Sequence, residues 1–190
     1  MRKSNIWTTV LIVFLTLVLL TVGLLSDYIF KYVEKAIYPE DYYELIVKYS
    51  REYSVPAALT FAVIKVESNF DKDAESSVGA LGLMQIMPST YEWLTTSKFN
   101  ETPRVSLLYD PETNIRYGTY YLQYLYKKFG TWEKALVAYN WGEGNFKRYM
   151  DENGYTEGDY HNLPVTETRN YVKKVNNAIE AYKKLYPENT

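Results

Sequence analysis

The 190-residue sequence contains no cysteine, which excludes a cysteine nucleophile, a disulfide framework and a thiolate metal site. Histidine occurs only once, at His161, so a cluster of histidine ligands cannot form and a Ser-His-Asp triad could use only that residue. The formal net charge of −2 argues against binding to nucleic acid. We therefore expect no metal site and no nucleic-acid partner. The remaining chemistry must use carboxylates, amides, hydroxyls and aromatic rings, of which the 21 tyrosines supply many.

Charged residues are absent from residues 6–25, and this stretch predicts a membrane span. As a helix, 20 residues extend ~30 Å, the thickness of the hydrocarbon core of a bilayer. The alternative is a cleaved signal peptide, whose apolar region has ~7–15 residues before an A-x-A-like site. This stretch is longer, and residues 23–27 offer a poor cleavage site. We therefore expect a short cytoplasmic tail at 1–5, a retained transmembrane anchor at 6–25 and a juxtamembrane tether at 26–38.

The flanking charges give the span only a weak orientation. Arg2 and Lys3 precede it, and Lys31 and Lys35 follow it, so the basic residues balance. The free amino terminus favours a cytoplasmic N-terminus.

A helical pattern of apolar residues runs through residues 39–187, the expected globular domain. Ser54 is a candidate N-cap for a following helix in which Pro56 is an early residue. Residues 110–112, Asp-Pro-Glu, combine a capping acid, proline at the first helical position and an acid facing the helix dipole. Gly130 is placed to end that helix.

A shorter helix is expected after Thr131, ending at Gly142 and Gly144. Residues 145–163 are polar and are expected to form a loop before a last helix. Because no alternating strand pattern is evident, the fold class expected for this domain is all-α, or nearly so.

Glu67 is the first candidate for chemistry. It lies near the end of an apolar helix, where partial burial would disfavour the ionised carboxylate and raise the pKa. A raised pKa is what a general acid requires near neutral pH. The alternative is an ordinary acid at a helix end, exposed or paired with Lys65 or Lys72.

Three other segments carry polar groups in unusual surroundings. Gly79 and Gly82 permit a tight bend, and Gln85 is a lone amide among apolar residues, paired either with a sugar or within the core. The Ala-Tyr-Asn sequence at 138–140 ends a helix, where the asparagine can also be a simple cap. Glu-Thr-Arg-Asn-Tyr-Val at 167–172 can be an acid-rich first helical turn.

The order of four motifs resembles one family. They are V-E-S-N-F at 66–70, G-L-M-Q-I-M-P-S-T at 82–90, A-Y-N with following glycines at 138–144, and E-T-x-x-Y-V at 167–172. Together they resemble the catalytic domain of the soluble-lytic-transglycosylase type, which cleaves bacterial peptidoglycan on a lysozyme-like α-helical fold. The resemblance extends over about residues 42–185.

The resemblance implies that Glu67 is the sole catalytic acid and base. Gln85 and Asn140 would hold amide and hydroxyl groups of the sugars near the cleaved bond, and Ser68 would help to fix the turn after the catalytic helix. No cofactor and no metal are implied. The residues expected to bind substrate or to line and brace the groove are Ser68, Gln85, Tyr139, Asn140, Glu167 and Tyr171.

The implied reaction cleaves the bond from N-acetylmuramic acid to N-acetylglucosamine and leaves a 1,6-anhydro ring on the muramic acid. Its implied partners are peptidoglycan glycan strands and, through the N-terminal helix, the bacterial cytoplasmic membrane. Because peptidoglycan lies outside that membrane, the resemblance implies a single-pass protein with its catalytic domain on the extracytoplasmic side. The sequence identifies no protein partner.

Two alternative functions remain open. A hydrolytic muramidase on the same fold would require a second carboxylate, and the acids within residues 71–75 are nearest in sequence. Their spacing also hints at calcium, but Ser76 and Gly82 occupy the positions where an EF-hand requires glycine and glutamate, so we expect a solvated loop. A non-catalytic glycan-binding scaffold would be expected to lack the acid, whereas Glu67 is present.

The sequence departs from the family pattern in two places. Trp141 follows Ala-Tyr-Asn where the family usually has a small residue, and residues 145–163 are rich in aromatic and acidic residues. Both departures could change which glycan subsite is favoured.

Overall fold

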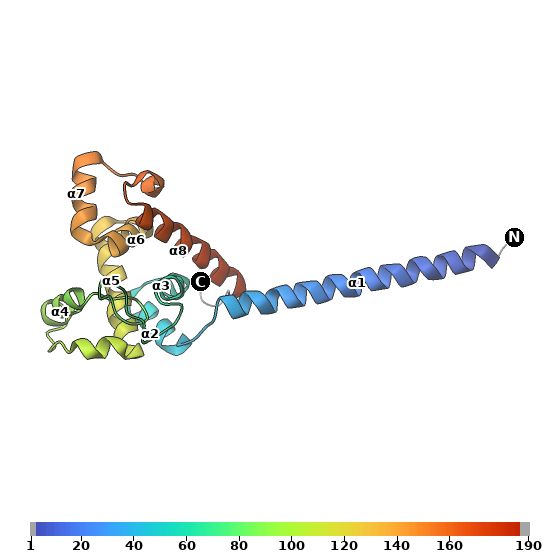
Figure 1. The fold of residues 1–190 in the computed structure, drawn as a ribbon, viewed down its shortest axis with the longest axis horizontal. Coiled ribbons are helices and arrows are strands. Elements are labelled where there is room, and N and C mark those ends of the chain that lie inside the picture. The colour runs from blue at the N-terminus through green and yellow to red at the C-terminus, as the bar shows by residue number, and fades with distance from the viewer. Residues whose placement is uncertain (1–2, 187–190) are drawn as a thin grey trace. The chain divides into compact units, whose positions relative to one another are not determined.

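The computed structural model describes residues 3–186 (Figure 1). The described residues form eight α-helices and two short 3₁₀ helices, with isolated β-bridges but no strand, as the predicted all-α class requires. The elements are α1 (Lys3–Ile37), α2 (Tyr43–Tyr53), α3 (Ala57–Glu67), α4 (Pro88–Ser97), η1 (Val105–Tyr109), α5 (Pro111–Phe129), α6 (Trp132–Trp141), α7 (Glu143–Asn153), η2 (Asp159–Asn162) and α8 (Thr166–Leu185).

The chain divides into two compact units, of which the first ends at Pro39 and the second begins at Glu40. The first unit contains α1, whose stretch Ile6–Ile37 is long and apolar enough to cross a membrane, with a mean hydropathy of 2.6 and no buried residue. At ~1.5 Å per residue, the 35-residue helix extends ~50 Å, more than the ~30 Å of a hydrocarbon core. The helix therefore continues through the segment expected to be a tether.

The core of the second unit surrounds α3. All seven residues from Ala58 to Ile64 are buried, because α2 and α8 pack against this helix. A helix covered on all sides needs no polar face, which explains why residues 58–64 are apolar except for Thr60. In the same unit, α5 packs against α2 and α6 (Figure 1). Glu67 is the last residue of α3 and so lies where this buried helix reaches the surface.

The ends of α5 follow the local signals of the sequence. The Asp110 side chain accepts a hydrogen bond from the backbone N–H of Thr113 at 2.8 Å, and Pro111 is the first helical residue. Gly130 ends the helix with φ of 88°, a conformation that favours glycine.

The structure contradicts the expected start of α3. Ser54 does not cap this helix; it ends α2 with φ of 56° and donates its backbone N–H to Ser50 and Arg51. The helix begins at Ala57, after Pro56. Proline disfavours the helical conformation in the residue before it, so the start is delayed beyond Val55.

The expected loop at 145–163 was also wrong. This region contains most of α7 and all of η2, and Gly144 lies inside α7 instead of ending α6. Phe146 of α7 is buried, with its ring centroid 5.1 Å from those of both Phe129 and Tyr155. Tertiary packing of one aromatic side chain stabilises a helix that the mostly polar local sequence does not indicate.

The segment between α3 and α4 has little regular structure and is held by Asn114 of α5. The buried Asn114 amide donates to the carbonyls of Leu81 at 2.9 Å and Leu108 at 2.7 Å. Its carbonyl oxygen accepts from the Met84 N–H at 2.7 Å. One side chain thus replaces the hydrogen bonds that a strand partner would supply, and fixes the backbone next to Gln85.

Two glycines allow this segment to approach α5 closely. At Gly82, where φ is 73°, an added Cβ would lie 2.2 Å from the Leu108 carbonyl oxygen and 2.3 Å from the Asn114 amide nitrogen. At Gly118 of α5 it would lie 2.4 Å from the sulfur of Met84. Neither position has room for a side chain.

Candidate active site

Glu67 is partly buried at the end of α3 and forms no ion pair with any described residue. The two lysines that could have neutralised it are directed elsewhere: Lys65 donates to Asn69, and Lys72 pairs with Asp73 at 2.7 Å. The alternative of an ordinary salt-bridged acid is therefore not what the structure shows.

The surroundings of Glu67 raise its pKa from the ordinary 4.5 to about 7. Burial is the largest cause, because it disfavours the charged carboxylate. An interaction with the Tyr171 hydroxyl favours the carboxylate and lowers the pKa, whereas the negative charge of Glu167 raises it. A carboxyl group with this pKa is present in both its protonated and its ionised form near neutral pH.

Glu67 lines a pocket of about 280 Å³, which we call the acid pocket. Three helices build it, since Glu67 ends α3, Asn140 lies near the end of α6, and Glu167 and Tyr171 lie on α8. Four of the predicted site residues are therefore brought together from positions far apart in the sequence. The acid pocket also contains residues that were not predicted: Val66, Asn170 and Lys174.

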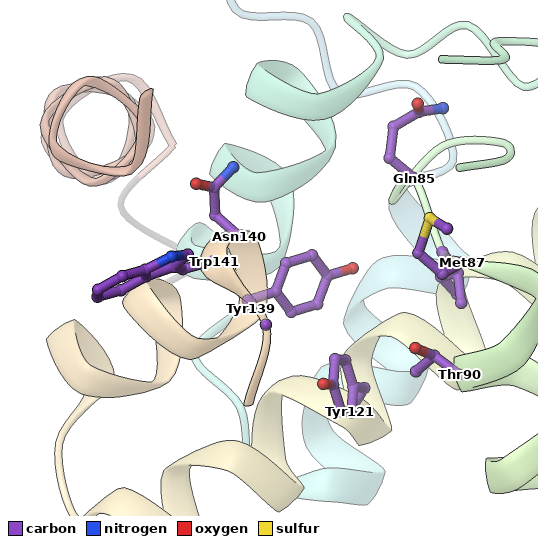
Figure 2. A pocket seen from close by; sticks show the side chains of 9 residues that line it. Gln85, Met87, Thr90, Tyr121, Tyr139, Asn140 and Trp141 are labelled. Carbon is purple, nitrogen blue, oxygen red and sulfur yellow. The ribbon is translucent and has the colours of Figure 1, made fainter. Parts of the chain in front are cut away.

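A second pocket of about 250 Å³, the aromatic pocket, contains the predicted residues Gln85, Tyr139 and Asn140 (Figure 2). Asn140 lines both pockets, so they adjoin at this residue, and we call the two together the groove. The other residues of the aromatic pocket are Ile86, Met87, Thr90, Tyr121, Trp141 and Gly142.

Several polar groups in the groove are unpaired. Within residues 3–186, the Asn140 amide and the Trp141 indole N–H form no hydrogen bond, and the buried Tyr171 hydroxyl has no partner of ordinary hydrogen-bond geometry. Gln85 donates its amide N–H to the carbonyls of Ala74 at 3.1 Å and Gly82 at 2.9 Å, which leaves its side-chain oxygen as an acceptor. Polar groups near a protein interior normally have partners, so this set is suited to a polar ligand.

Two predicted residues are used to hold the site together. The Tyr139 hydroxyl donates to the Met84 carbonyl at 2.7 Å, which joins α6 to the segment that carries Gln85. The Ser68 hydroxyl donates to the Leu83 carbonyl at 2.8 Å and joins the end of α3 to the same segment. Ser68 lines neither pocket, so the structure places it beside the groove and not within it.

Sequence reasoning missed some residues of the groove. Tyr121 of α5 is not among the predicted site residues, yet it lines the aromatic pocket, with its ring centroid 5.5 Å from that of Tyr139. Only the packing of α5 on α6 reveals this role. Lys174 could have been found, because it lies three residues after Tyr171 and seven after Glu167, on the same face of a helix.

Except for Tyr121 and Lys174, the residues of the groove come from the four motifs that carried the family resemblance. A family model of the transglycosylase SLT domain matches residues 44–162. The chain belongs to this family. The resemblance inferred from the sequence is thereby confirmed, and so is the lysozyme-like, all-α fold class expected for the domain.

Two relatives named as lytic murein transglycosylases match about three quarters of this chain. The soluble lytic murein transglycosylase of Escherichia coli (strain K12) is 36% identical over 160 residues, covering 78% of this chain and 24% of the relative. The membrane-bound lytic murein transglycosylase C of Serratia proteamaculans (strain 568) is 33% identical over 168 residues, covering 75% of this chain and 47% of the relative. The chain thus spans between a quarter and a half of the length of these relatives.

Solved structures agree with the sequence relatives. The 70-kDa soluble lytic transglycosylase of Escherichia coli matches with a TM-score of 0.73 and 33% identity, over 80% of this chain and 25% of that one. An inactive glutamate-to-glutamine mutant of the lytic transglycosylase Slt of Pseudomonas aeruginosa matches with a TM-score of 0.70 and 31% identity, over 78% and 25%.

Proposed function

We propose that this SLT-domain protein is a membrane-anchored peptidoglycan lytic transglycosylase. The observation that carries the proposal is one carboxyl group, Glu67, with a pKa raised to about 7 in a pocket that also contains unpaired amide and hydroxyl groups. Relatives named as lytic murein transglycosylases support it, as does the inactive mutant of one relative in which a glutamate is replaced by glutamine.

The proposed reaction uses Glu67 twice. Protonated Glu67 donates its proton to the oxygen that links N-acetylmuramic acid to N-acetylglucosamine, and this bond breaks as positive charge develops at the anomeric carbon of the muramic acid. The resulting carboxylate then accepts the proton of that sugar's 6-hydroxyl, whose oxygen bonds to the anomeric carbon and closes a 1,6-anhydro ring. No water is consumed, and Glu67 is protonated again. Acid–base catalysis of this kind contributes about 10²–10⁴-fold.

The unpaired groups have corresponding proposed roles. The Asn140 amide, at the junction of the two pockets, would bind an acetamido or hydroxyl group of a sugar beside the cleaved bond, and the free oxygen of Gln85 would accept from another. Tyr171 and Glu167 would set the protonation of Glu67 and line the acid pocket. Tyr139 and Ser68 would hold the groove in shape through their backbone contacts.

A hydrolytic muramidase is the second candidate because Glu167 shares the acid pocket with Glu67. Glycosidases that use water normally require two carboxylates. The acids nearest in sequence do not line the acid pocket. Asp71 accepts a hydrogen bond from the backbone N–H of Asp73, Asp73 pairs with Lys72, and Glu75 accepts from Tyr109. Glu167 would have to act as the base or nucleophile.

The test is mass spectrometry of fragments released from purified peptidoglycan by the full-length protein in detergent micelles. Fragments that end in anhydro-muramic acid, one water lighter than reducing ends, support the transglycosylase. Reducing ends would favour the muramidase, and binding without cleavage would favour a scaffold. Glu67→Gln keeps the size of the side chain and removes the acid, so activity should fall at least about 10²-fold; unchanged activity would refute the role of Glu67.

We further propose that residues 1–5 are a cytoplasmic tail, 6–25 a transmembrane anchor, 26–38 a tether and 39–187 the catalytic domain. The protein would cross the bacterial cytoplasmic membrane once and place this domain on the side of the cell wall. The apolar character of α1 and the membrane-bound relative support this arrangement.

A further inference from the structure

Trp141 has a place in the groove that the proposed reaction does not use. It is the last residue of α6 and lines the aromatic pocket, whereas Glu67 lines the acid pocket. Asn140, the residue before Trp141, lines both pockets. Figure 2 shows the indole extending from the end of α6 beside Asn140, while Met87 lies on the other side of the pocket. Trp141 therefore marks one end of the aromatic pocket.

The indole is supported on one side and remains partly accessible. Its one ring contact within the described structure is with Tyr149 of α7, at 5.4 Å between centroids. The Trp141 carbonyl accepts a hydrogen bond from the Asn145 side chain at 2.9 Å, which fixes the backbone of the residue. Since the indole N–H has no partner in residues 3–186, the ring presents both an apolar face and a free donor.

The helix behind the indole is itself fixed. Glu143, the first residue of α7, accepts hydrogen bonds from the Tyr124 hydroxyl at 3.1 Å and from Lys128, both on α5. Buried Phe146 holds the next turn of α7. The helix that contacts Trp141 is thus held against α5 and the core, which lowers the cost of ordering the ring when a ligand binds to it.

The chemistry of the aromatic pocket matches an amino-sugar ring. A pyranose ring has an apolar face of C–H groups and a polar rim, and the side chains of Trp141, Tyr121 and Met87 offer apolar surface beside the amides of Asn140 and Gln85. Aromatic side chains with a polar edge suit ligands of this mixed character.

We propose that Trp141 is a binding platform for a pyranose ring of the glycan strand, and that it makes the enzyme select long strands over short ones. This inference rests on the proposed function. Glu67 does not line the aromatic pocket, so the sugar bound by Trp141 is not the one whose bond receives the proton. A strand must therefore be long enough to occupy both pockets before it contacts Trp141 and reacts.

The test measures binding without reaction. β-1,4-linked N-acetylglucosamine oligomers of two to six sugars are titrated calorimetrically into full-length Glu67→Gln protein in detergent, alone and with Trp141→Ala, Trp141→Phe or Trp132→Phe. Trp132 is the matched control, because it stacks on Tyr126 and lines neither pocket. We expect Trp141→Ala to weaken hexamer binding about 10-fold and dimer binding less than about 2-fold, with Trp141→Phe retaining most of the affinity.

Three results would overturn the proposal. These are equal hexamer affinity in Trp141→Ala and its parent, an equal loss for dimer and hexamer, or no binding of any oligomer by the parent. Circular dichroism of each variant identifies misfolding, and the Trp141→Phe variant tests the platform if Trp141→Ala does not fold. The reaction does not take place in this assay, so its result is independent of the chemical outcome. Trp141 can prove to bind a sugar ring even if anhydro ends are never found. Conversely, the binding proposal can be refuted while the transglycosylase activity is confirmed.

Discussion

Burial of Glu67 raises its pKa, as the proposed catalysis requires, but makes the ionised carboxylate costly for the stability of the fold. Its pKa in the folded protein is about 7, above the ordinary 4.5, so the folded state binds the proton more tightly than the unfolded state. The contribution of Glu67 to the free energy of unfolding is therefore fully present below pH 4.5 and is lost as the pH rises through 7. A shift of this size corresponds to about 3 kcal/mol at most, and we expect about 1–3 kcal/mol because the residue is only partly buried.

Glu67→Gln should remove this pH dependence. Because an amide never ionises, the stability of the variant relative to the wild type should be greater at pH 8 than at pH 5, by most of that margin. Urea unfolding at the two pH values measures the difference. An identical effect of the substitution at both pH values would show that the carboxyl is not held in its protonated form.

Substitutions of Tyr171 and Glu167 should shift the pH profile of activity in opposite directions. The proposed reaction requires Glu67 to be protonated in the free enzyme, so kcat/KM should fall as the pH rises through about 7. Tyr171→Phe removes the interaction that lowers the pKa and should shift this fall to higher pH. Glu167→Gln removes a negative charge and should shift it to lower pH. Loss of activity without either shift would mean that these residues act only on binding.

On the scale of elements, the segment between α3 and α4 depends on a close approach to α5. Gly82→Ala should lower the free energy of unfolding by at least about 3 kcal/mol, because the new Cβ overlaps the Leu108 carbonyl and the Asn114 amide at positive φ. Gly79→Ala is the matched control: its φ is 83°, but nothing lies within 4 Å, so we expect a loss of about 1 kcal/mol. Urea unfolding midpoints compare them, and equal losses would contradict the importance of the contact.

Replacing the two glycines around the start of α7 by alanine should change the free energy of unfolding in opposite directions. Gly144 is helical and its added Cβ would meet nothing within 4 Å, so Gly144→Ala should stabilise the protein by about 0.5 kcal/mol. Gly142 has φ of 90° between α6 and α7, and Gly142→Ala should destabilise it by about 1 kcal/mol or more. Thermal unfolding of both variants provides the measurement. A loss of stability in Gly144→Ala would be inconsistent with a helix at this position.

Sequence reasoning located both ends of α5 because they are determined locally. Asp110 and Gly130 delimit α5 through their own side-chain and backbone preferences, and the structure confirms both. The helix α7 could not be predicted in this way, because its stability comes from Phe146 packing on residues distant in sequence. The same distinction applies to the groove. Its motif residues were predicted from the sequence, whereas the position of Tyr121 in the aromatic pocket depends on how α5 packs against α6.

Across the whole molecule, the long apolar helix and the proposed substrate constrain the orientation together. Peptidoglycan lies outside the cytoplasmic membrane, so an enzyme that acts on it needs its second unit on that side. Basic residues balance at two on each side of the span, which leaves the orientation sensitive to small changes in charge. The long helix α1 has the apolar length to cross, but its own sequence does not settle the direction.

Charge substitutions should therefore alter the orientation in a predictable direction. Removing the basic residues after the span, with Lys31→Gln and Lys35→Gln, should keep the second unit outside, because positive charge then remains only on the cytoplasmic side. Removing those before it, with Arg2→Gln and Lys3→Gln, should trap a fraction of molecules in the opposite orientation. Protease added to intact bacteria, or to spheroplasts where a wall or outer membrane blocks access, should digest the second unit of the wild type and of the first variant. It should leave part of the second variant intact. Protection of the wild-type domain under these conditions would reverse the proposed topology, and with it the access to peptidoglycan on which the proposed reaction depends.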